Sequence, residues 1–346
     1  MRAVLLERLG APEVLVERQI ESPPPAPGEV KIEVMAAGVN FADLLQRLGL
    51  YGSAPSLPYT PGFEVAGVVR ETGSAIEELK KGDRVVGLAK LGGYAEAICL
   101  PAASVKRLPE HFSFRKAAAL PVNYLTAWFC LFPMGTLRSG DRLLIHGGTG
   151  GVGIAAVQLA QELAVEIFAT VGSERKREYL EMRGLKHVIN YNSNDFTEYV
   201  RQHTDGQGVE LVLDGVGGRN LRRSYELLVP MGRLISFGLS AAAPTKRKSW
   251  LRALAAWWRT PRFRPLDMIG RNVGVFGFHL AHLGSKQWMI HTALETLIDK
   301  VEEGILEPVI SAEFPLSGEG AVQAHHYLHE RRNIGKVLLI RQGDSQ

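Results

Sequence analysis

A glycine-rich stretch between two apolar runs constrains the fold of this chain most strongly. Residues 145–160 read IHGGTGGVGIAAVQLA, in which residues 148–153 match the pattern G-x-G-x-x-G. The run 142–147 predicts a strand and the run 151–163 a helix, so the glycines lie in a strand-to-helix turn, the context of a dinucleotide-binding loop. Glycine permits a tight turn and a close approach of the backbone to a pyrophosphate. The alternative is a glycine-rich turn that binds nothing.

After about residue 122 the chain alternates between strands and helices. Further strands are expected at 166–172, 187–191, 209–217, 233–238 and 272–278. Such alternation predicts a doubly wound parallel sheet with helices on both faces. The segment before residue 122 predicts a β-rich domain, because it contains short apolar runs between glycine turns: 29–39, 61–73 and 82–88. A helix at 287–304 and a strand at 336–340 are expected near the C-terminus.

Cysteine content and the uncharged segments indicate the environment of the protein. Its two cysteines, Cys99 and Cys130, are too few for a disulfide framework or a four-thiolate zinc site, and they fit a reducing cytoplasm. The N-terminal residues do not read as a signal peptide. Residues 117–137 carry no charge, but they include two prolines and several polar residues, so we expect a buried core segment and not a membrane span. These features predict a cytoplasmic protein.

Positive charge is concentrated in one stretch. The formal net charge is +4, yet residues 245–266 hold seven basic residues and no acidic one. Within 246–265, tryptophans recur at helical spacing among the bases, a pattern that can lie in a membrane interface. We favour a lid over the substrate or a subunit contact, with peripheral membrane contact through 246–265 as the alternative. Nucleic-acid binding is not expected, because no recognition motif accompanies the charge.

The end of the second strand in the alternating region indicates which dinucleotide binds. NAD sites usually place a carboxylate there, about 20 residues past the glycines, on the ribose 2′-hydroxyl. Here the strand ends in TVGS (170–173), followed by ERK (174–176). A hydroxyl with a nearby ammonium group suits a 2′-phosphate, which needs donors and positive charge. We therefore predict NADP(H) as the cofactor, with a solvated helix position as the alternative role of Lys176.

In this order, the segments resemble the medium-chain dehydrogenase/reductase superfamily over nearly the whole chain. The resemblance is carried by PAPGEVKIEVMAAGVNFADLLQRLGLY, LPYTPGFEVAGVV, GDRVVGL, AAALPVNYLTAW, HGGTGGVG and NIGKVLLI. It implies an α/β fold with a GroES-like β-rich catalytic domain at 1–122, a Rossmann NADP-binding domain at 123–280, and a return to the catalytic domain at 281–346. Members often pair through the edge of the Rossmann sheet, here expected at 272–278, so we expect a homodimer.

Within the superfamily the chain looks most like the zinc-independent quinone oxidoreductases. Zinc alcohol dehydrogenases place a cysteine within the segment matching 37–43, a His-Glu pair matching Phe63-Glu64, a further ligand near Asn123, and a four-cysteine lobe. Here the cysteines are missing and the hydrocarbon side chain of Phe63 cannot bind a metal, so no metal site is expected. The Asn-x-x-Asp pattern of the quinone oxidoreductases stands at 40–43, and PVNYLTAW with KSWLRALAAWW resembles their vesicle amine transport protein branch.

The resemblance assigns roles to individual residues. Asn40, Tyr51 and Thr126 would face the nicotinamide and the substrate. Residues implied at the cofactor come from the glycine loop, from the 2′-phosphate site and from the ends of the fifth and sixth strands: Thr149, Gly150, Gly151, Val152, Gly153, Ser173, Lys176, Tyr191, Arg331, Gly238, Ser240 and Phe278. Arg332 follows Arg331, and the sequence leaves open which of the two meets the phosphate.

Other polar residues are expected to have structural roles. For Asp43 we expect a local hydrogen bond or helix cap, and for Glu64 an internal ion pair. His146 precedes the glycine loop and is expected in the core or beside a helix. The histidines near the C-terminus are expected together on one exposed helix: His325, His326 and His329.

Two functions from different classes follow. The first is an NADPH-dependent, zinc-independent oxidoreductase that transfers hydride to a quinone or another α,β-unsaturated carbonyl compound, a small apolar or planar substrate. The acceptor gains negative charge during the transfer, so it needs a hydrogen-bond donor, a role open to Tyr51 and Asn40. The alternative is a membrane-associated or lipid-binding protein of the vesicle amine transport type with weak or no reductase activity.

Overall fold

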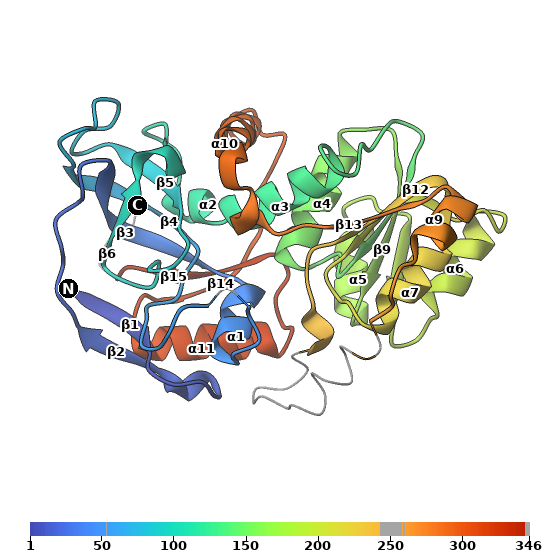
Figure 1. The fold of residues 1–346 in the computed structure, drawn as a ribbon, viewed down its shortest axis with the longest axis horizontal. Helices are drawn as coiled ribbons and strands as arrows, with labels where there is room; N and C mark the ends of the chain where they lie inside the picture. The colour runs from blue at the N-terminus through green and yellow to red at the C-terminus, as the bar shows by residue number, and fades with distance from the viewer. Residues whose placement is uncertain (53, 243–257, 259, 343–346) are drawn as a thin grey trace. The chain divides into compact units, whose positions relative to one another are not determined.

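The computed structural model describes residues 1–52, 54–242, 258 and 260–342, which form two compact units. The β-rich unit contains residues 1–125 and 281–342. The parallel-sheet unit contains residues 126–242, 258 and 260–280. Figure 1 shows the elements of each unit.

The parallel-sheet unit is built on strands that alternate with helices. Within the described residues its sheet has six strands, all parallel, in the order β10-β9-β8-β11-β12-β13. The strands are β8 (Arg142–His146), β9 (Glu166–Val171), β10 (His187–Asn190), β11 (Val209–Asp214), β12 (Leu228–Ser236) and β13 (Gly274–Gly277). The helices are α4 (Gly151–Gln161), α5 (Glu174–Glu181), α6 (Phe196–His203), α7 (Arg219–Glu226) and α9 (Pro265–Arg271). The predicted doubly wound parallel sheet is confirmed.

The strand order of this sheet determines where a ligand can bind. From β8 the chain moves outward through β9 and β10, and then returns to β11 on the other side of β8. The order therefore reverses beside β8, and in open parallel sheets ligands bind at the carboxyl ends of the strands at such a point. The glycine loop begins there, directly after His146.

The β-rich unit contains a mainly antiparallel sheet in the order β14-β15-β3-β4-β5-β7, with β6 paired to β3 and a separate β1–β2 pair. Its strands are β1 (Arg2–Leu6), β2 (Leu15–Gln19), β3 (Glu29–Val39), β4 (Glu64–Thr72), β5 (Arg84–Leu88), β6 (Ala97–Pro101), β7 (Val105–Arg107), β14 (Ile310–Pro315) and β15 (Lys336–Ile340). Its helices are α1 (Phe41–Arg47), α2 (Phe114–Ala118), α10 (Gln287–Glu302) and α11 (Gly318–His329). Helix α3 (Pro121–Leu131) begins in this unit and ends in the other. The described residues of the two units also contain single 3-10 turns at Pro12–Val14, Ala102–Ser104, Ser240–Ala242, Leu280–His282 and Gly284–Lys286.

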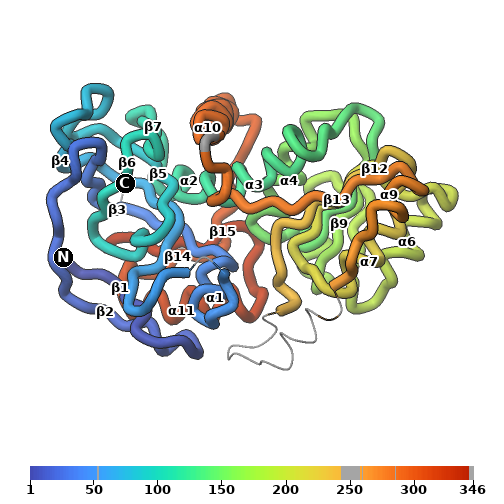
Figure 2. Tube along the Cα trace, viewed as in Figure 1, coloured from blue at the N-terminus to red at the C-terminus, as the bar shows by residue number. Residues whose placement is uncertain are grey.

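The C-terminal strand closes this sheet against the N-terminal part of the chain. Strand β15 pairs with β3 in an antiparallel register, so that Val337 lies opposite Val39 and Leu339 opposite Ala37. Figure 2 labels both strands along the Cα trace. These apolar residues are buried in one core with residues of β1, β4 and α11. The expected strands at 29–39, 61–73, 82–88 and 336–340 are confirmed, each within a few residues of its predicted ends.

One expectation about α11 is wrong. The sequence predicts His325 on an exposed helix face, but its side chain is completely buried. The buried residues of α11 include Ala321, Ala324, His325 and Leu328, which recur at i, i+3, i+4 and i+7 and form the face that packs on the sheet. His325 takes a core position in this pattern, whereas His326 and His329 are half-buried.

Three further expectations concern surfaces. Strand β13 pairs with β12 alone among the described residues, so the prediction that 272–278 forms a sheet edge is confirmed, while the homodimer stays a prediction. No helix in the described ranges is long and apolar enough to cross a membrane. The tryptophan-rich basic stretch 246–265 lies for the most part outside the described residues. Trp258, the tryptophan of this stretch that the structure describes, is 82% exposed.

The core of the parallel-sheet unit provides a test of the fold. Phe168 on β9 is completely buried and stacks on His187 with ring centroids 4.4 Å apart. We expect Phe168→Ala to lower the free energy of unfolding by about 3–5 kcal/mol, because it leaves a cavity in a packed core. The control Met231→Ala removes a side chain that is 74% exposed, and we expect a change of less than about 0.5 kcal/mol. Urea titrations followed by circular dichroism measure both values, and equal effects would contradict this packing.

Candidate functional site

The glycine loop forms a compact turn at the end of β8. Gly147 has a positive φ of 71°, and the Gly148 N–H donates to the carbonyl of Thr170 at 2.9 Å. Gly150 is the N-cap of α4, and its N–H donates to the Gly147 carbonyl at 2.8 Å. The first backbone N–H groups of a helix have no acceptor within the helix, so the start of α4 offers donors to an anion.

Gly153 shows why this loop requires glycine beyond the turn itself. A Cβ atom at Gly153 would lie 2.2 Å from the carbonyl oxygen of Gly147 and 2.8 Å from the Cα of Gly148. The first turn of α4 therefore lies directly against the strand-to-loop turn, an approach that any side chain would prevent. This is the packing role of the third glycine in a dinucleotide-binding loop, and the loop fits a pyrophosphate.

A histidine and a threonine beside the glycine loop fix its first residue through hydrogen bonds. His146 contacts Thr170 Oγ1 through Nδ1 at 3.1 Å and Ser224 Oγ through Nε2 at 2.9 Å. The Thr170 hydroxyl also accepts from the N–H of Gly147 at 3.2 Å. His146 is buried, as expected, and burial lowers its pKa, which favours the neutral ring. Sequence reasoning missed Thr170 and Ser224, because their link to the loop depends on pairing between separate strands and helices.

The predicted 2′-phosphate residues of this unit follow the neighbouring strands β9 and β10. Ser173 is the N-cap of α5, and Lys176 lies in the first turn of that helix. Tyr191 follows β10 and lies so close to Gly172 that a Cβ atom there would be 2.4 Å from the tyrosine hydroxyl oxygen. Arg331 belongs to the β-rich unit, where it follows α11 with a positive φ of 55°.

The carboxylate nearest this strand end is engaged elsewhere. Glu174 accepts a hydrogen bond from Asn190 at 2.6 Å and forms an ion pair with Arg177 at 2.6 Å. The hydrogen bond from Asn190 is the largest of the effects that lower the pKa of Glu174, so the side chain is ionised and directed toward these partners. Its neighbours Arg175, Lys176 and Arg177 make the start of α5 basic, which suits a phosphate better than a ribose hydroxyl.

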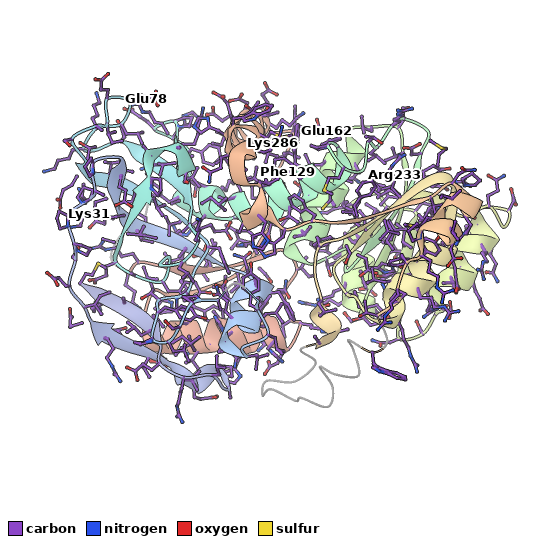
Figure 3. The ribbon with its side chains drawn as sticks, viewed as in Figure 1. Lys31, Glu78, Phe129, Glu162, Arg233 and Lys286 are labelled. Carbon is purple, nitrogen blue, oxygen red and sulfur yellow. The ribbon has the colours of Figure 1, made fainter. Side chains whose placement is uncertain are left out.

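The remaining cofactor candidates of this unit lie at the ends of β12 and β13. Gly238 follows β12 and packs against Gly215, and the N–H of Ser240 donates to the Gly215 carbonyl at 3.1 Å. Phe278 follows β13, is buried, and stacks on Phe129 of α3 with centroids 5.6 Å apart (Figure 3 labels Phe129). Thr126, on the same helix as Phe129, is buried as well.

In the β-rich unit, Asn40 stands at the N-terminus of α1. It forms a capping box with Asp43, in which the Asn40 N–H donates to Asp43 Oδ2 at 2.8 Å. The expected cap role of Asp43 is confirmed. The Asn40 side chain points into a buried cluster, where its Nδ2 donates to Glu64 Oε1 at 2.7 Å and its Oδ1 accepts from Lys336 Nζ at 2.7 Å.

Glu64 and Lys336 form a buried ion pair, and the expected internal pair of Glu64 is thereby confirmed. The second carboxylate oxygen of Glu64 accepts from the N–H of Val122, in the first turn of α3, at 2.7 Å. Both oxygens of this fully buried carboxylate therefore have partners. Lys336 was not identified as the partner from the sequence, because nothing local to either residue indicates a pairing between β4 and β15.

Tyr51 lies beside Phe63, with ring centroids 5.7 Å apart and planes at 57°. The tyrosine is half-buried, whereas Phe63 is buried and directly precedes Glu64. The structure thus brings Tyr51 against Phe63, the residue for which the resemblance implies a metal ligand in the zinc enzymes. Among the described residues, no group of three or more histidines, cysteines, aspartates or glutamates is arranged to hold a metal ion.

Comparison with known proteins gives consistent matches. The family model "Alcohol dehydrogenase GroES-like domain" matches residues 26–110, and "Zinc-binding dehydrogenase" matches residues 183–339. The chain is 36% identical over 327 residues to the synaptic vesicle membrane protein VAT-1 homolog of Rattus norvegicus, covering 94% of this chain and 80% of that protein. It is 31% identical over 343 residues to the quinone oxidoreductase of the same species, covering 98% of each. The crystal structure of Escherichia coli quinone oxidoreductase complexed with NADPH superimposes with a TM-score of 0.87 at 29% identity, covering 98% of this chain and 100% of that one.

The buried ion pair gives the second prediction. We expect Lys336→Met to lower the free energy of unfolding by about 3–5 kcal/mol, because it leaves Glu64 buried without its cation. Adding Glu64→Gln to this variant should restore most of the loss, since the uncompensated charge is then removed. Lys31→Met is the control, because the partner of Lys31 is Glu71 on the surface. Urea titration gives all values, and a loss no larger than that of Lys31→Met would contradict the pairing.

Proposed function

This chain belongs to the medium-chain dehydrogenase/reductase superfamily, and we propose that within it the protein is an NADPH-dependent, zinc-independent reductase of quinones or other α,β-unsaturated carbonyl compounds. The observation that carries the proposal is the end of β9, where Tyr191 lies against Gly172 and α5 begins with a hydroxyl at Ser173 and a lysine at Lys176. The nearest carboxylate is bound to Asn190 and Arg177. Such a site suits the 2′-phosphate of NADPH.

The cofactor would be held by the carboxyl end of the parallel sheet. The loop at 148–153 and the start of α4 supply N–H donors for the pyrophosphate, and Ser173, Lys176 and Tyr191 supply donors for the 2′-phosphate. When bound, the reduced nicotinamide supplies the hydride. Gly238, Ser240 and Phe278 are proposed to contact the rest of the cofactor, because they follow the outer strands at the same edge of the sheet.

Zinc independence is supported by the chemistry of the residues in the zinc positions. Phe63 offers only a hydrocarbon ring, and the carboxylate of Glu64 is already bound by Asn40, Lys336 and the N–H of Val122. Activation of the acceptor is therefore assigned to hydrogen-bond donors. The phenol of Tyr51 and the second hydrogen of the Asn40 amide are the proposed donors to the carbonyl oxygen, where charge develops during hydride transfer.

A second function is favoured by one observation. Trp258, the described residue at the end of the tryptophan-rich stretch, has an 82% exposed side chain, and exposed tryptophans beside basic residues favour binding to a membrane interface. The name of the synaptic vesicle relative points the same way. We therefore keep peripheral lipid binding as the alternative, and binding to anionic liposomes that Trp258→Ala abolishes would support it.

Cofactor preference is the third prediction. We expect Lys176→Ala to weaken NADPH binding by about tenfold to a hundredfold, the effect of losing one hydrogen bond to a charged group, and to leave NADH binding unchanged. Lys186→Ala, which removes an exposed lysine with the same charge, is the matched control. Fluorescence titration of the reduced nicotinamide measures these affinities. Equal losses for the two cofactors would contradict a role of Lys176 at the 2′-phosphate.

Turnover tests the reaction itself. We expect the protein to oxidise NADPH in the presence of a para-quinone or an enone, and Tyr51→Phe to lower kcat about a hundredfold, because the acceptor oxyanion loses a donor. NADPH affinity should not change in this variant, since Tyr51 is not assigned to the cofactor phosphates. Binding of NADPH without oxidation by any quinone or enone would contradict the proposed reaction and favour the lipid-binding alternative.

A further inference from the structure

A chain of buried polar side chains in the β-rich unit leads toward Asn40 and is not explained by the proposed reaction. It begins at Arg47, in the last turn of α1, whose side chain is completely buried. The guanidinium donates through Nη1 to the carbonyl of Gly10 and through Nε to His325 Nδ1 at 3.3 Å. The other ring nitrogen of His325, Nε2, lies 3.3 Å from the hydroxyl of Tyr94, which is also buried.

The direction of these hydrogen bonds follows from the chemistry of Arg47. Burial lowers the pKa of Arg47 to about 10, so the guanidinium is still charged at neutral pH and can only donate. His325 must therefore accept at Nδ1, and burial lowers its pKa well below the usual value, which keeps the ring neutral. The single ring proton is then on Nε2, which donates to the oxygen of Tyr94. Tyr94 uses its own proton for a hydrogen bond to Asp43.

Asp43 joins two segments that carry predicted site residues. Its Oδ2 accepts from the N–H of Asn40 at 2.8 Å, and its Oδ1 accepts from the N–H of Gly62 at 3.1 Å. Gly62 has a φ of +106°, and a Cβ atom there would lie 2.7 Å from a ring carbon of Tyr94. The next residue, Phe63, is the aromatic neighbour of Tyr51. One carboxylate therefore fixes both the start of α1 and the turn before β4.

These contacts require Asp43 to be ionised, because a protonated carboxyl group would have to donate from one of its two oxygens. Asp43 is completely buried, and burial raises its pKa to about 7. The N–H of Asn40, Lys336 and Tyr94 lower its pKa, and Glu64 raises it. The Gly62 N–H and the Tyr59 hydroxyl also face this carboxylate. The donors therefore offset part of the effect of burial, and the loss of one of them favours protonation.

We propose that Tyr94 and His325 are positioning residues of the reductase site: through the hydrogen-bonded chain from Arg47 they keep Asp43 ionised, so that both of its oxygens hold Asn40 and the Gly62 turn in place. The inference rests on the proposed function, in which Asn40 and Tyr51 contact the substrate. The chain from Arg47 to Asp43 is itself independent of the reaction.

The test compares two deletions of a phenol hydroxyl. Tyr94→Phe removes the donor to Asp43 and leaves the ring in place. Tyr59→Phe is the matched control, because the Tyr59 hydroxyl is also buried and feels the charge of Asp43 but has no hydrogen-bond partner among the described residues. Two readouts are measured: hydrogen exchange of the backbone amides of Asn40 and Gly62, and the pH dependence of kcat/KM for NADPH-dependent reduction of a quinone. NADPH affinity serves as the check that each variant is folded.

For Tyr94→Phe we expect exchange at one or both amides to become up to about tenfold faster at pH 9, about two units above the pKa of Asp43. At that pH a rise of about one unit in this pKa multiplies the small protonated fraction about tenfold, and each protonated carboxyl group has lost one acceptor oxygen. The donor lowers the pKa of Asp43, so its loss raises that pKa. The acid limb of the profile, where activity falls as Asp43 takes up a proton, should therefore move to higher pH by about one unit. Tyr59→Phe should match the wild type in both readouts.

Unchanged amide exchange and an unchanged acid limb in Tyr94→Phe would overturn the inference, as would equal changes in both variants. Faster exchange without a change in the acid limb would overturn the positioning role and leave a structural one. A wild-type protein that reduces no quinone or enone would contradict the proposed function alone. The amide exchange would then still decide whether Tyr94 holds Asp43.

Discussion

The buried ion pair between Glu64 and Lys336 is the interaction on which the β-rich unit depends. The two residues are 272 positions apart in the sequence, and their pairing joins β4 to the C-terminal strand β15. Removing two charges from water is costly, and a buried pair is tolerated only when its remaining polar atoms are also satisfied. Asn40 and the N–H of Val122 meet this requirement and thereby connect the pair to α1 and α3. Asn40, one of the proposed substrate residues, is therefore held in place by this ion pair.

The parallel-sheet unit positions its ligand-binding groups by a different principle. Loops that follow parallel strands meet at the same edge of the sheet, and the reversal of strand order beside β8 opens that edge to a ligand. Glycine at 153 lets α4 start against the turn, and Thr170 holds Gly147 from the neighbouring strand. Backbone N–H groups supply the hydrogen-bond donors to the pyrophosphate, so few side chains are needed for binding. The residues at the end of β9 then determine the choice between NADPH and NADH.

Local patterns predict much of this fold and part of the site. The strands of the parallel sheet and the glycine turn could be located because apolar runs, glycines and helix-forming runs alternate with little interruption. The start of β12 at Leu228 could not be located from the sequence and lies five residues before its predicted position. Pro230 and Gly232 interrupt the apolar run, although Leu228 still pairs with Val209. The register shift in that pairing is set by the neighbouring strand and leaves no local signal.

Long-range polar contacts were the least predictable feature. The sequence predicted that Asp43 forms a cap and that Glu64 forms an internal ion pair. It did not predict the partner of Glu64 or the hydrogen-bonded chain through Tyr94 and His325, because these contacts form only when β4, β15 and α11 come together. The helical spacing of Ala321, Ala324 and Leu328 indicates a buried face that includes His325. The presence of neighbouring histidines instead suggested a polar face, which was wrong because α11 buries His325 and leaves His326 and His329 nearer the surface.

The transfer of hydride from NADPH to the substrate tests the proposed reductase function most directly. NADPH carrying deuterium on the transferred position of the nicotinamide is incubated with the protein and an α,β-unsaturated ketone, and the reduced ketone is examined by mass spectrometry. We expect one deuterium on carbon in each product molecule, with the label absent when the protein is omitted. Bound NADPH that keeps its deuterium while the ketone is left unreduced would contradict the assignment of this chain as a reductase.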